Sequence, residues 1–246
     1  MINYKEYYIA FLDILGFSSK IGKEDATIIH GIFTRIKALK RITRGTAFDG
    51  HAATELEQNT KFLFFSDTIV CAIPTSIYGA FETLTSHCMM IQHYLYSEES
   101  PVLLRGAIVK GEMYINGSEM FGPGLIDAYR MEESLAIYPR IIMTRGTYED
   151  GIAQSNGGEE IMYVCDTDDG LKMVETLKYF DYSPELARLK NLIEMKIATE
   201  QNARVREKYL WLRTHFNLCV NKGSRVPEFR EPIKWRKSNV QSEYFG

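Results

Sequence analysis

Two short apolar stretches of the chain each carry a single carboxylate. Asp13 lies in YYIAFLDILGFSSK (residues 7–20), and Asp67 lies in KFLFFSDTIVCAIP (residues 61–74). A carboxylate inside an apolar strand costs free energy unless it is paired or bound to a cation. Two carboxylates that lie close together repel each other unless a divalent ion sits between them. The pattern therefore predicts that Asp13 and Asp67 share a metal ion.

The surrounding elements must bring these two residues together. Hydrophobic periodicity predicts them in the order strand, helix, strand, strand, helix, strand. They are expected at 7–12, 25–42, 61–65, 68–73, 77–96 and 101–115, with a tight turn at Ser66-Asp67. This order matches the ferredoxin-like split βαβ pattern, in which the first strand lies beside the hairpin. We predict an α+β fold, an antiparallel sheet with helices over one face.

The rest of the chain extends this unit. A polar stretch at 44–60 is expected to be a loop, FGPG is expected to turn into a helix, and PRIIMT and 156–166 are expected to return as strands. Ser183-Pro184-Glu185 is a favourable helix start, with a capping hydroxyl and proline at the first helical position. A charged helix is predicted from there to about residue 218. The expected division is a catalytic domain at 1–182 and a long C-terminal helix with a polar tail at 183–246.

Composition excludes several classes of protein. The chain has 246 residues and a net charge of −3, so it offers no reason to expect a polyanion-binding surface. No apolar run reaches membrane-spanning length, and the N-terminus does not resemble a signal peptide. The four cysteines lack the short spacings of a zinc motif and are expected to be reduced thiols of a cytoplasmic protein.

The predicted ligands indicate the kind of metal and of substrate. Carboxylate oxygens suit Mg²⁺ or Mn²⁺, which usually complete their coordination with substrate phosphates. Gly16 follows Asp13 closely, so the backbone of Gly16, Phe17 and Ser18 can approach a triphosphate without obstruction by a Cβ at the glycine. The alternative is structural: Asp13 caps the following turn, and Asp67 belongs only to the hairpin.

Three motifs in this order carry a family resemblance. FLDILGF followed by FFSDTIV resembles the metal-binding pair of class III nucleotidyl cyclases. EMFGPGLIDAYRME is similar to the stretch in which that family places an aromatic-glycine pair and a catalytic arginine, here Phe121, Gly122 and Arg130. LLRGAIVKGE resembles the family's Arg-x-Gly-x-x-x-Gly strand and aligns Arg105 with its arginine. The resemblance covers roughly residues 7–145.

This resemblance implies a mechanism. Two divalent ions, Mn²⁺ or Mg²⁺, held by Asp13, Asp67 and the backbone carbonyl of Ile14, activate the ribose 3'-hydroxyl and neutralise the triphosphate. Arg130 stabilises charge that develops on the phosphoryl oxygens. The family's site is shared between two chains, which implies a homodimer. The alternative for Arg130 is a surface ion pair with Glu132 or Glu133 of its own helix.

Departures from the family pattern concern the base and the ribose. Ile126 stands where the family has a ribose-binding asparagine, Leu63 where adenylate cyclases have a base-reading lysine, and Glu119 where they have its aspartate partner. The late triphosphate-binding lysine is not placed; Lys172 and Lys178 are the candidates.

The motif set looks most like the bacterial pyrimidine cyclases of antiphage defence. This implies that UTP, or next CTP, is converted to a cyclic nucleotide that activates a separate effector protein. The alternatives are an adenylate or guanylate cyclase and a catalytically inactive nucleotide-sensing module.

Overall fold

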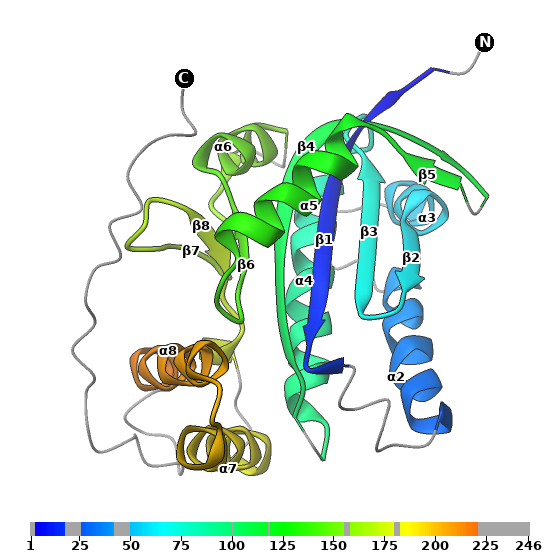
Figure 1. The fold of residues 1–246 in the computed structure, drawn as a ribbon. Helices are drawn as coiled ribbons and strands as arrows, with labels where there is room; N and C mark the ends of the chain where they lie inside the picture. The colour runs from blue at the N-terminus through cyan, green and yellow to red at the C-terminus, as the bar shows by residue number, and fades with distance from the viewer. Residues whose placement is uncertain are drawn as a thin grey trace.

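The computed structural model describes residues 3–17, 26–41, 50–99, 101–117, 119–154, 158–179 and 183–220 (Figure 1). Its elements are, in chain order, β1 (Lys5–Leu15), α2 (Ala26–Ala38), the 3₁₀ turn η1 (Leu39–Arg41), α3 (Gly50–Asn59), β2 (Lys61–Phe65), β3 (Thr68–Pro74), α4 (Ala80–Ser97), β4 (Leu103–Asn116), β5 (Glu119–Phe121), α5 (Pro123–Leu135), β6 (Ile141–Met143), α6 (Arg145–Ala153), β7 (Val164–Asp166), β8 (Lys172–Val174), the 3₁₀ turn η3 (Leu177–Tyr179), α7 (Ser183–Thr199) and α8 (Ala203–Cys219).

The strands form one mixed sheet in the order β2-β3-β1-β4-β6-β8-β7, with β5 paired to β4 off this path. Its first half is the predicted arrangement, because β1 pairs antiparallel with both β3 and β4. One pair, β4–β6, is parallel, so the sheet is not antiparallel throughout. The predicted α+β fold class is confirmed.

Alternation along β1 divides the core between the two faces of the sheet. Tyr8 and Leu12 belong to a cluster that includes residues of α2 and α4, whereas Ile9 belongs to a cluster that includes residues of α5. Figure 1 shows α5 crossing in front of the sheet and α4 behind it. Helices therefore cover both faces, and the expectation of helices over one face holds only for α2 and α4.

Helix α5 lies unusually close to β4 at its N-terminal end. A Cβ added to Gly111 of β4 would lie 2.7 Å from the Cα of Gly124 in α5. A side chain at either position would push the helix off the strand, so two glycines are needed where the two backbones meet. This contact fixes the start of the helix that carries Arg130.

Four short elements differ from the sequence predictions. The stretch predicted as a loop contains α3 within its described residues, because Leu56 is fully buried and anchors one face of the helix to the core. Helix α6 and strands β5 and β8 were not predicted. All three are short, and propensity within so few residues is a weak signal beside tertiary packing.

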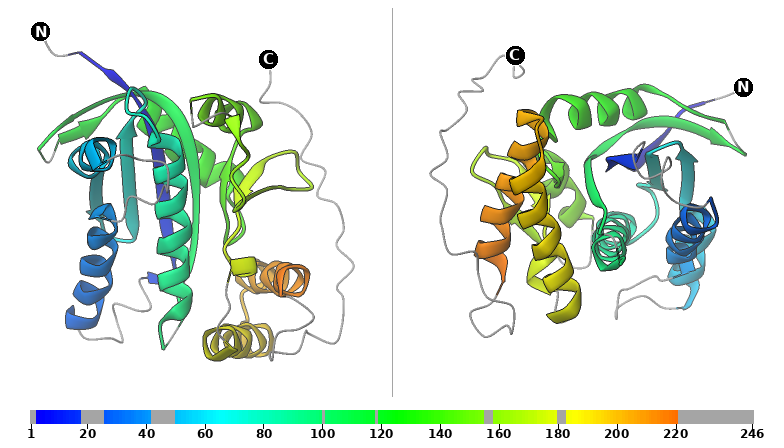
Figure 2. Two further views of the ribbon diagram at one scale, coloured as in Figure 1. Left: turned by 180° about the vertical axis from the view of Figure 1, so that it is seen from behind. Right: turned by 60° about the horizontal axis from the view of Figure 1, so that its bottom comes forward.

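The C-terminal segment forms two helices rather than the one long helix predicted. The Asn202 side chain accepts hydrogen bonds from the backbone N–H groups of Arg204 and Val205 at 3.0 and 3.3 Å, which caps α8 and interrupts the helical run. Helices α7 and α8 lie side by side (Figure 2, right) and share a core cluster with Tyr96 of α4 and Leu103 of β4. No helix among the described residues is long and apolar enough to cross a membrane.

Candidate active site

The β2–β3 hairpin places Asp67 beside the C-terminal end of β1. Ser66 takes a positive φ of 53°, as the primed turns of two-residue hairpins require. The turn then docks on β1, where the N–H of Ile14 donates to the carbonyl oxygen of Asp67 at 2.9 Å. Asp13 precedes this contact and pairs with Thr68 across the strands. The backbone of Asp67 therefore lies beside Ile14, the residue that follows Asp13, as the predicted hairpin arrangement requires.

Asp13 has a direct ionic partner that the sequence did not reveal. The register of β1 and β4 sets Arg105 opposite Asp13, and the Arg105 Nε lies 2.9 Å from Asp13 Oδ2. The same Nε lies 2.7 Å from Oε1 of Glu132, which reaches it from α5. Glu132 is therefore turned inward to Arg105 and not outward to Arg130.

Burial makes this cluster electrostatically unusual. The side chain of Glu132 is 3% exposed, against 19% for Asp13 and 21% for Arg105. Burial raises the pKa of Glu132 to about 7, and the nearby Asp13 and Glu133 carboxylates add to this rise while Arg105 and Lys208 oppose it. Perturbed acids of this kind occur most often at functional sites, although ion-pair networks also produce them.

Lys208 is a residue of this site that sequence analysis missed. It lies on α8, and its pKa is lowered by burial and by Arg105, while Asp13 and Glu132 raise it. Its electrostatic neighbours are therefore the groups of the Asp13–Arg105–Glu132 cluster. No local pattern could have identified Lys208, because 195 positions separate it from Asp13 and only the folding of α8 brings it there.

The predicted base-contacting position, Leu63, lies on the same face of the sheet as Asp13. It pairs with Val70 of β3 and packs against the cluster on the α5 side. Phe62 and Phe64 point to the opposite face, where Phe64 contacts Phe33 at 5.1 Å between ring centroids. These two phenylalanines therefore cannot narrow a base pocket at Leu63.

The turn after β1 has the open backbone that was expected. Gly16 has a φ of +76°, and a Cβ there would meet none of the described residues within 4 Å. The side chain of Phe17 does not face this space, because it is buried at 5% exposure and contacts Phe33 at 5.9 Å. It anchors the turn to the core. Ser18, the third predicted residue, lies outside the described residues.

Arg130 and Glu119 lie away from the acidic pair along the chain. Arg130 is exposed on α5, and Ile126, one turn earlier, is 51% exposed. Glu119 pairs with Asn116 at the far end of β4, eleven residues and roughly 35 Å of strand beyond Arg105. Within one chain, Glu119 therefore lies at the opposite end of β4 from Arg105 and the acidic pair.

The two lysine candidates have different positions. Lys172 is 7% exposed, and its Nζ lies 3.1 Å from Asp166 Oδ1 and 4.7 Å from the centre of the Tyr148 ring. Lys178 is exposed in η3. Lys172 thus already has a local structural role in the β7–β8 hairpin.

The donor set at the end of β1 fits a hard divalent cation. Asp13 and Asp67 offer four carboxylate oxygens, of which Arg105 contacts one. Both residues are only partly buried. Oxygen donors of this kind are the ones that Mg²⁺ and Mn²⁺ prefer.

Comparisons with known proteins give a likeness of fold. No family model matches the chain, and no curated protein matches it. Among solved structures, the guanylyl cyclase domain of a fusion protein from the fungus Blastocladiella emersonii is similar with a TM-score of 0.47 and 13% identity, over 70% of this chain and 95% of that one. The adenylyl cyclase CyaB from P. aeruginosa gives 0.45 and 12%, over 71% and 95%. A likeness at this level does not identify an activity, so the function rests on the residues of the chain itself.

Proposed function

We propose that this protein is a metal-dependent nucleotidyl cyclase that converts a pyrimidine nucleoside triphosphate, UTP before CTP, to its 3',5'-cyclic monophosphate and pyrophosphate. The observation that carries the proposal is the junction of β1 with the β2–β3 turn. There Asp13 directly precedes Ile14, and the N–H of Ile14 donates to the carbonyl oxygen of Asp67. Two partly open carboxylates at one strand end form a site for a cation that binds phosphate.

Each residue then has a stated role. Asp13, Asp67 and the carbonyl of Ile14 hold the divalent ions, which supply activation of the ribose hydroxyl and charge neutralisation when bound. Arg105 positions Asp13 through its Nε and retains four further N–H donors for phosphate oxygens. Arg130 stabilises the charge that develops on the α-phosphate as pyrophosphate leaves.

The position of Arg130 supports a site shared by two chains. Arg130 is exposed on the outer side of α5, where it can reach a neighbouring molecule. Large apolar side chains are also exposed on α5 and β5, among them Phe121 at 46%, Ile126 at 51% and Tyr129 at 45%. Exposed apolar side chains of this size are common at protein interfaces. The proposed enzyme is accordingly a homodimer.

Complementation tests the shared site. Chains carrying Asp13→Ala and chains carrying Arg130→Ala are each expected to be inactive. After subunit exchange, a heterodimer has one intact site and one doubly damaged site, so part of the activity should return. If exchange is confirmed by mass and no activity returns, Asp13 and Arg130 act within one chain.

The preference for a pyrimidine follows from Leu63. Its side chain cannot donate a hydrogen bond to a ring nitrogen, and it lies on the sheet face that carries Asp13. A purine would leave polar edge atoms unpaired against it, at about 1–3 kcal/mol for each group. Uracil is placed before cytosine on family resemblance alone, and the same resemblance is the basis for a cyclic-nucleotide-activated antiviral effector.

One experiment tests the activity and the base together. The protein is incubated with equal concentrations of ATP, GTP, CTP and UTP and with Mn²⁺, and the products are measured by mass spectrometry. Cyclic UMP should dominate, with cyclic CMP second. Mainly cyclic AMP or cyclic GMP would contradict the pocket assignment and retain the cyclase, whereas no cyclic product with any nucleotide would contradict the enzyme.

The ion pair between Arg105 and Asp13 favours a second candidate function. An arginine on a metal-binding carboxylate already neutralises part of its charge. A nucleotide-sensing module without catalysis would tolerate this arrangement. Nucleotide binding by calorimetry, together with the absence of cyclic products in the incubation above, would identify this module.

A further inference from the structure

A cluster of three potential metal ligands lies far along the chain from the acidic pair. Within the described residues, Glu175, His215 and Cys219 are the group of three or more histidine, cysteine or carboxylate side chains whose ligand atoms all lie within 4.8 Å of one another. Glu175 directly follows β8, whereas His215 and Cys219 lie one turn apart on α8. The cluster therefore joins the end of β8 to the C-terminal helix.

The three ligand atoms already have nearly the spacing of a tetrahedral site. Oε2 of Glu175 lies 3.1 Å from Nε2 of His215 and 3.1 Å from Sγ of Cys219, and Sγ lies 3.5 Å from Nε2. A zinc ion at ordinary bond lengths separates such atoms by about 3.4–3.6 Å. The ligands would need to spread by no more than about 0.5 Å to admit the ion.

The ligands are also held in place by their neighbours. The backbone N–H of Leu177 donates to Oε1 of Glu175 at 2.8 Å, which leaves Oε2 directed at the other two ligands. The imidazole of His215 stacks on Trp211, with ring centroids 5.0 Å apart and planes 16° from parallel. Metal sites use contacts of this kind with surrounding residues to fix the orientation of their ligands.

Burial and chemistry indicate which ion fits. Glu175 is 2% exposed and Cys219 is 7% exposed, while the side chain of His215 is 15% exposed and borders a small cavity lined also by Gln92 and Thr176. A thiolate, an imidazole and one carboxylate form a mixed set of soft and borderline donors, which suits Zn²⁺ far better than Mg²⁺ or Mn²⁺. A water molecule from the cavity side can complete four-coordination.

We propose that Glu175, His215 and Cys219 bind one Zn²⁺ ion per chain and that this ion fastens α8 to the end of β8. The ligands are Glu175 Oε2, His215 Nε2 and Cys219 Sγ. On binding, the thiol loses its proton to solvent and the metal–sulfur bond replaces the hydrogen bond from Cys219 to Glu175.

The zinc site has a geometric consequence for α8. Lys208, Trp211, His215 and Cys219 stand at spacings of three, four and four residues, which places them on one face of the helix. The ion therefore fixes the same helix face that brings Lys208 to the Asp13–Arg105–Glu132 cluster. The link between the zinc ion and Lys208 rests on the proposed function, whereas the zinc site itself does not.

Metal content provides the test, independent of any enzymatic activity. Purified protein, stripped with a chelator and reloaded with Zn²⁺, is analysed by elemental mass spectrometry, and Co²⁺ is used as a spectroscopic substitute. We expect one Zn²⁺ per chain, a thiolate-to-Co²⁺ charge-transfer band, and a rise of about 5 °C or more in the unfolding midpoint with Zn²⁺. Binding below half an equivalent, or a Co²⁺ spectrum without the charge-transfer band, would overturn the site.

Variants assign the ligands. Cys219→Ala should abolish the charge-transfer band, and Glu175→Gln, which keeps an acceptor for Leu177, should weaken Zn²⁺ affinity by about 10–100-fold. Cys88→Ala is the control, because Cys88 is a free thiol in a different core cluster, on α4. It should keep one Zn²⁺ per chain. Unchanged metal binding by Glu175→Gln and Cys219→Ala, with circular dichroism confirming their fold, would place the metal elsewhere.

Discussion

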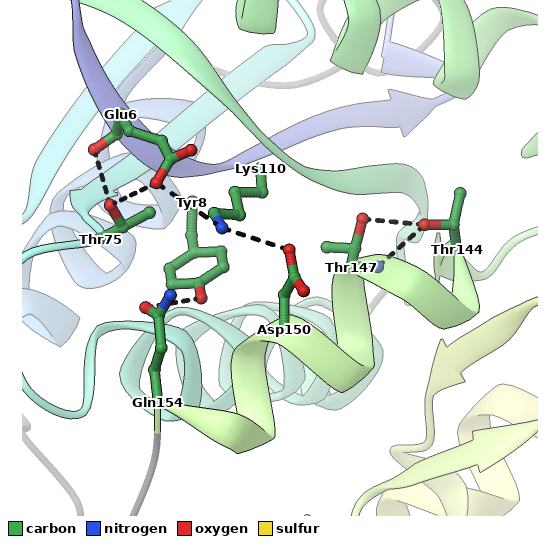
Figure 3. Close-up of polar contacts among 8 residues, drawn as sticks. All are labelled: Glu6, Tyr8, Thr75, Lys110, Thr144, Thr147, Asp150 and Gln154. Carbon is green, nitrogen blue, oxygen red and sulfur yellow. Dashed lines mark hydrogen bonds and ion pairs between the residues drawn. The ribbon is translucent and has the colours of Figure 1, made fainter.

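The two ends of the β1–β4 pair carry the same arrangement of charges in opposite environments. At the N-terminal end of β1, Lys110 lies 3.7 Å from Glu6 and 3.2 Å from Asp150 of α6 (Figure 3). At the other end, Arg105 lies between Asp13 and Glu132 of α5. In both cases β4 supplies the cation, β1 supplies one carboxylate and a following helix supplies the other.

Exposure separates these two clusters. The Glu6 and Asp150 side chains are 49% and 59% exposed, so water screens their interaction with Lys110. Glu132 is 3% exposed, and its pKa is raised to about 7 mainly by burial. The same three-charge arrangement is thus a solvated surface contact at one end and a charge-sensitive site at the other. Four measurements test this difference.

The largest difference is expected in catalysis. Asp13→Asn and Asp67→Asn each remove a ligand charge from the proposed metal site, and turnover with Mn²⁺ should fall by more than about 100-fold. Glu6→Gln changes the same kind of group at the exposed end of β1 and should leave turnover within about twofold. Initial rates of cyclic nucleotide formation provide the measurement. Near-normal rates in either aspartate variant would remove both residues from the metal site.

Stability should also respond unequally to loss of the central cation. At pH 8, Arg105→Met leaves buried Glu132 and Asp13 without their partner, which should lower the free energy of unfolding by about 3–5 kcal/mol. Lys110→Met breaks exposed pairs only and should lower it by less than about 1 kcal/mol. Urea denaturation measures both values. Equal losses in the two variants would show that burial does not distinguish the clusters.

The third difference concerns pH. Because the pKa of Glu132 is raised from 4.5 to about 7 in the folded chain, the native state holds a proton between these values that the unfolded state has lost. The proton held by Glu132 stabilises the folded chain fully below pH 4.5. This stabilisation, about 3 kcal/mol, is lost as the pH rises to about 7.

Replacement of Glu132 isolates this effect. Glu132→Gln should therefore gain stability over the wild type between pH 5 and pH 8, and urea denaturation across that range measures the difference. Glu6→Gln is the matched control at the exposed end and should differ from the wild type by less than about 0.5 kcal/mol throughout. A difference between Glu132→Gln and wild type that stays constant with pH would contradict the raised pKa.

The smallest effect is expected beside Lys110. The Tyr8 hydroxyl donates to Oε1 of Gln154 at 3.0 Å in the contact network of Figure 3. Tyr8→Phe removes that hydrogen bond and keeps the ring in the core, so the free energy of unfolding should fall by about 1 kcal/mol. Thermal denaturation measures this, with Tyr4→Phe at an exposed position as the control. A loss as large as that of Arg105→Met would contradict the small contribution expected of this hydrogen bond.

The sequence predicted the parts of the fold that follow from long periodic segments. The first six elements and the turn at Ser66-Asp67 follow from apolar spacing, and the proximity of Asp13 and Asp67 follows from their order. Helix α3 was missed because its sequence is polar and its place depends on a single fully buried residue, Leu56. The break at Asn202 was missed because asparagine acts as a cap only once the chain turns there.

The candidate site was less predictable than the fold. Pairing of Asp13 with Arg105 depends on the register of β1 and β4, and neither strand's own sequence determines that register. The inward turn of Glu132 depends on how α5 packs, and the approach of Lys208 depends on α8. The roles of Arg130 and Glu119 stay predictions, as does the division into domains at residue 182.

The contact between Gly111 and Gly124 has a mechanical consequence. No side chain separates the two backbones, so α5 packs directly on β4 and cannot move closer to it. A force on the outer face of the helix therefore acts directly on the strand. Arg105 lies six residues away on that strand, and Arg130 lies six residues away on that helix. Binding of a second chain to α5 would therefore displace the helix and β4 together, and with them Arg130 and Arg105.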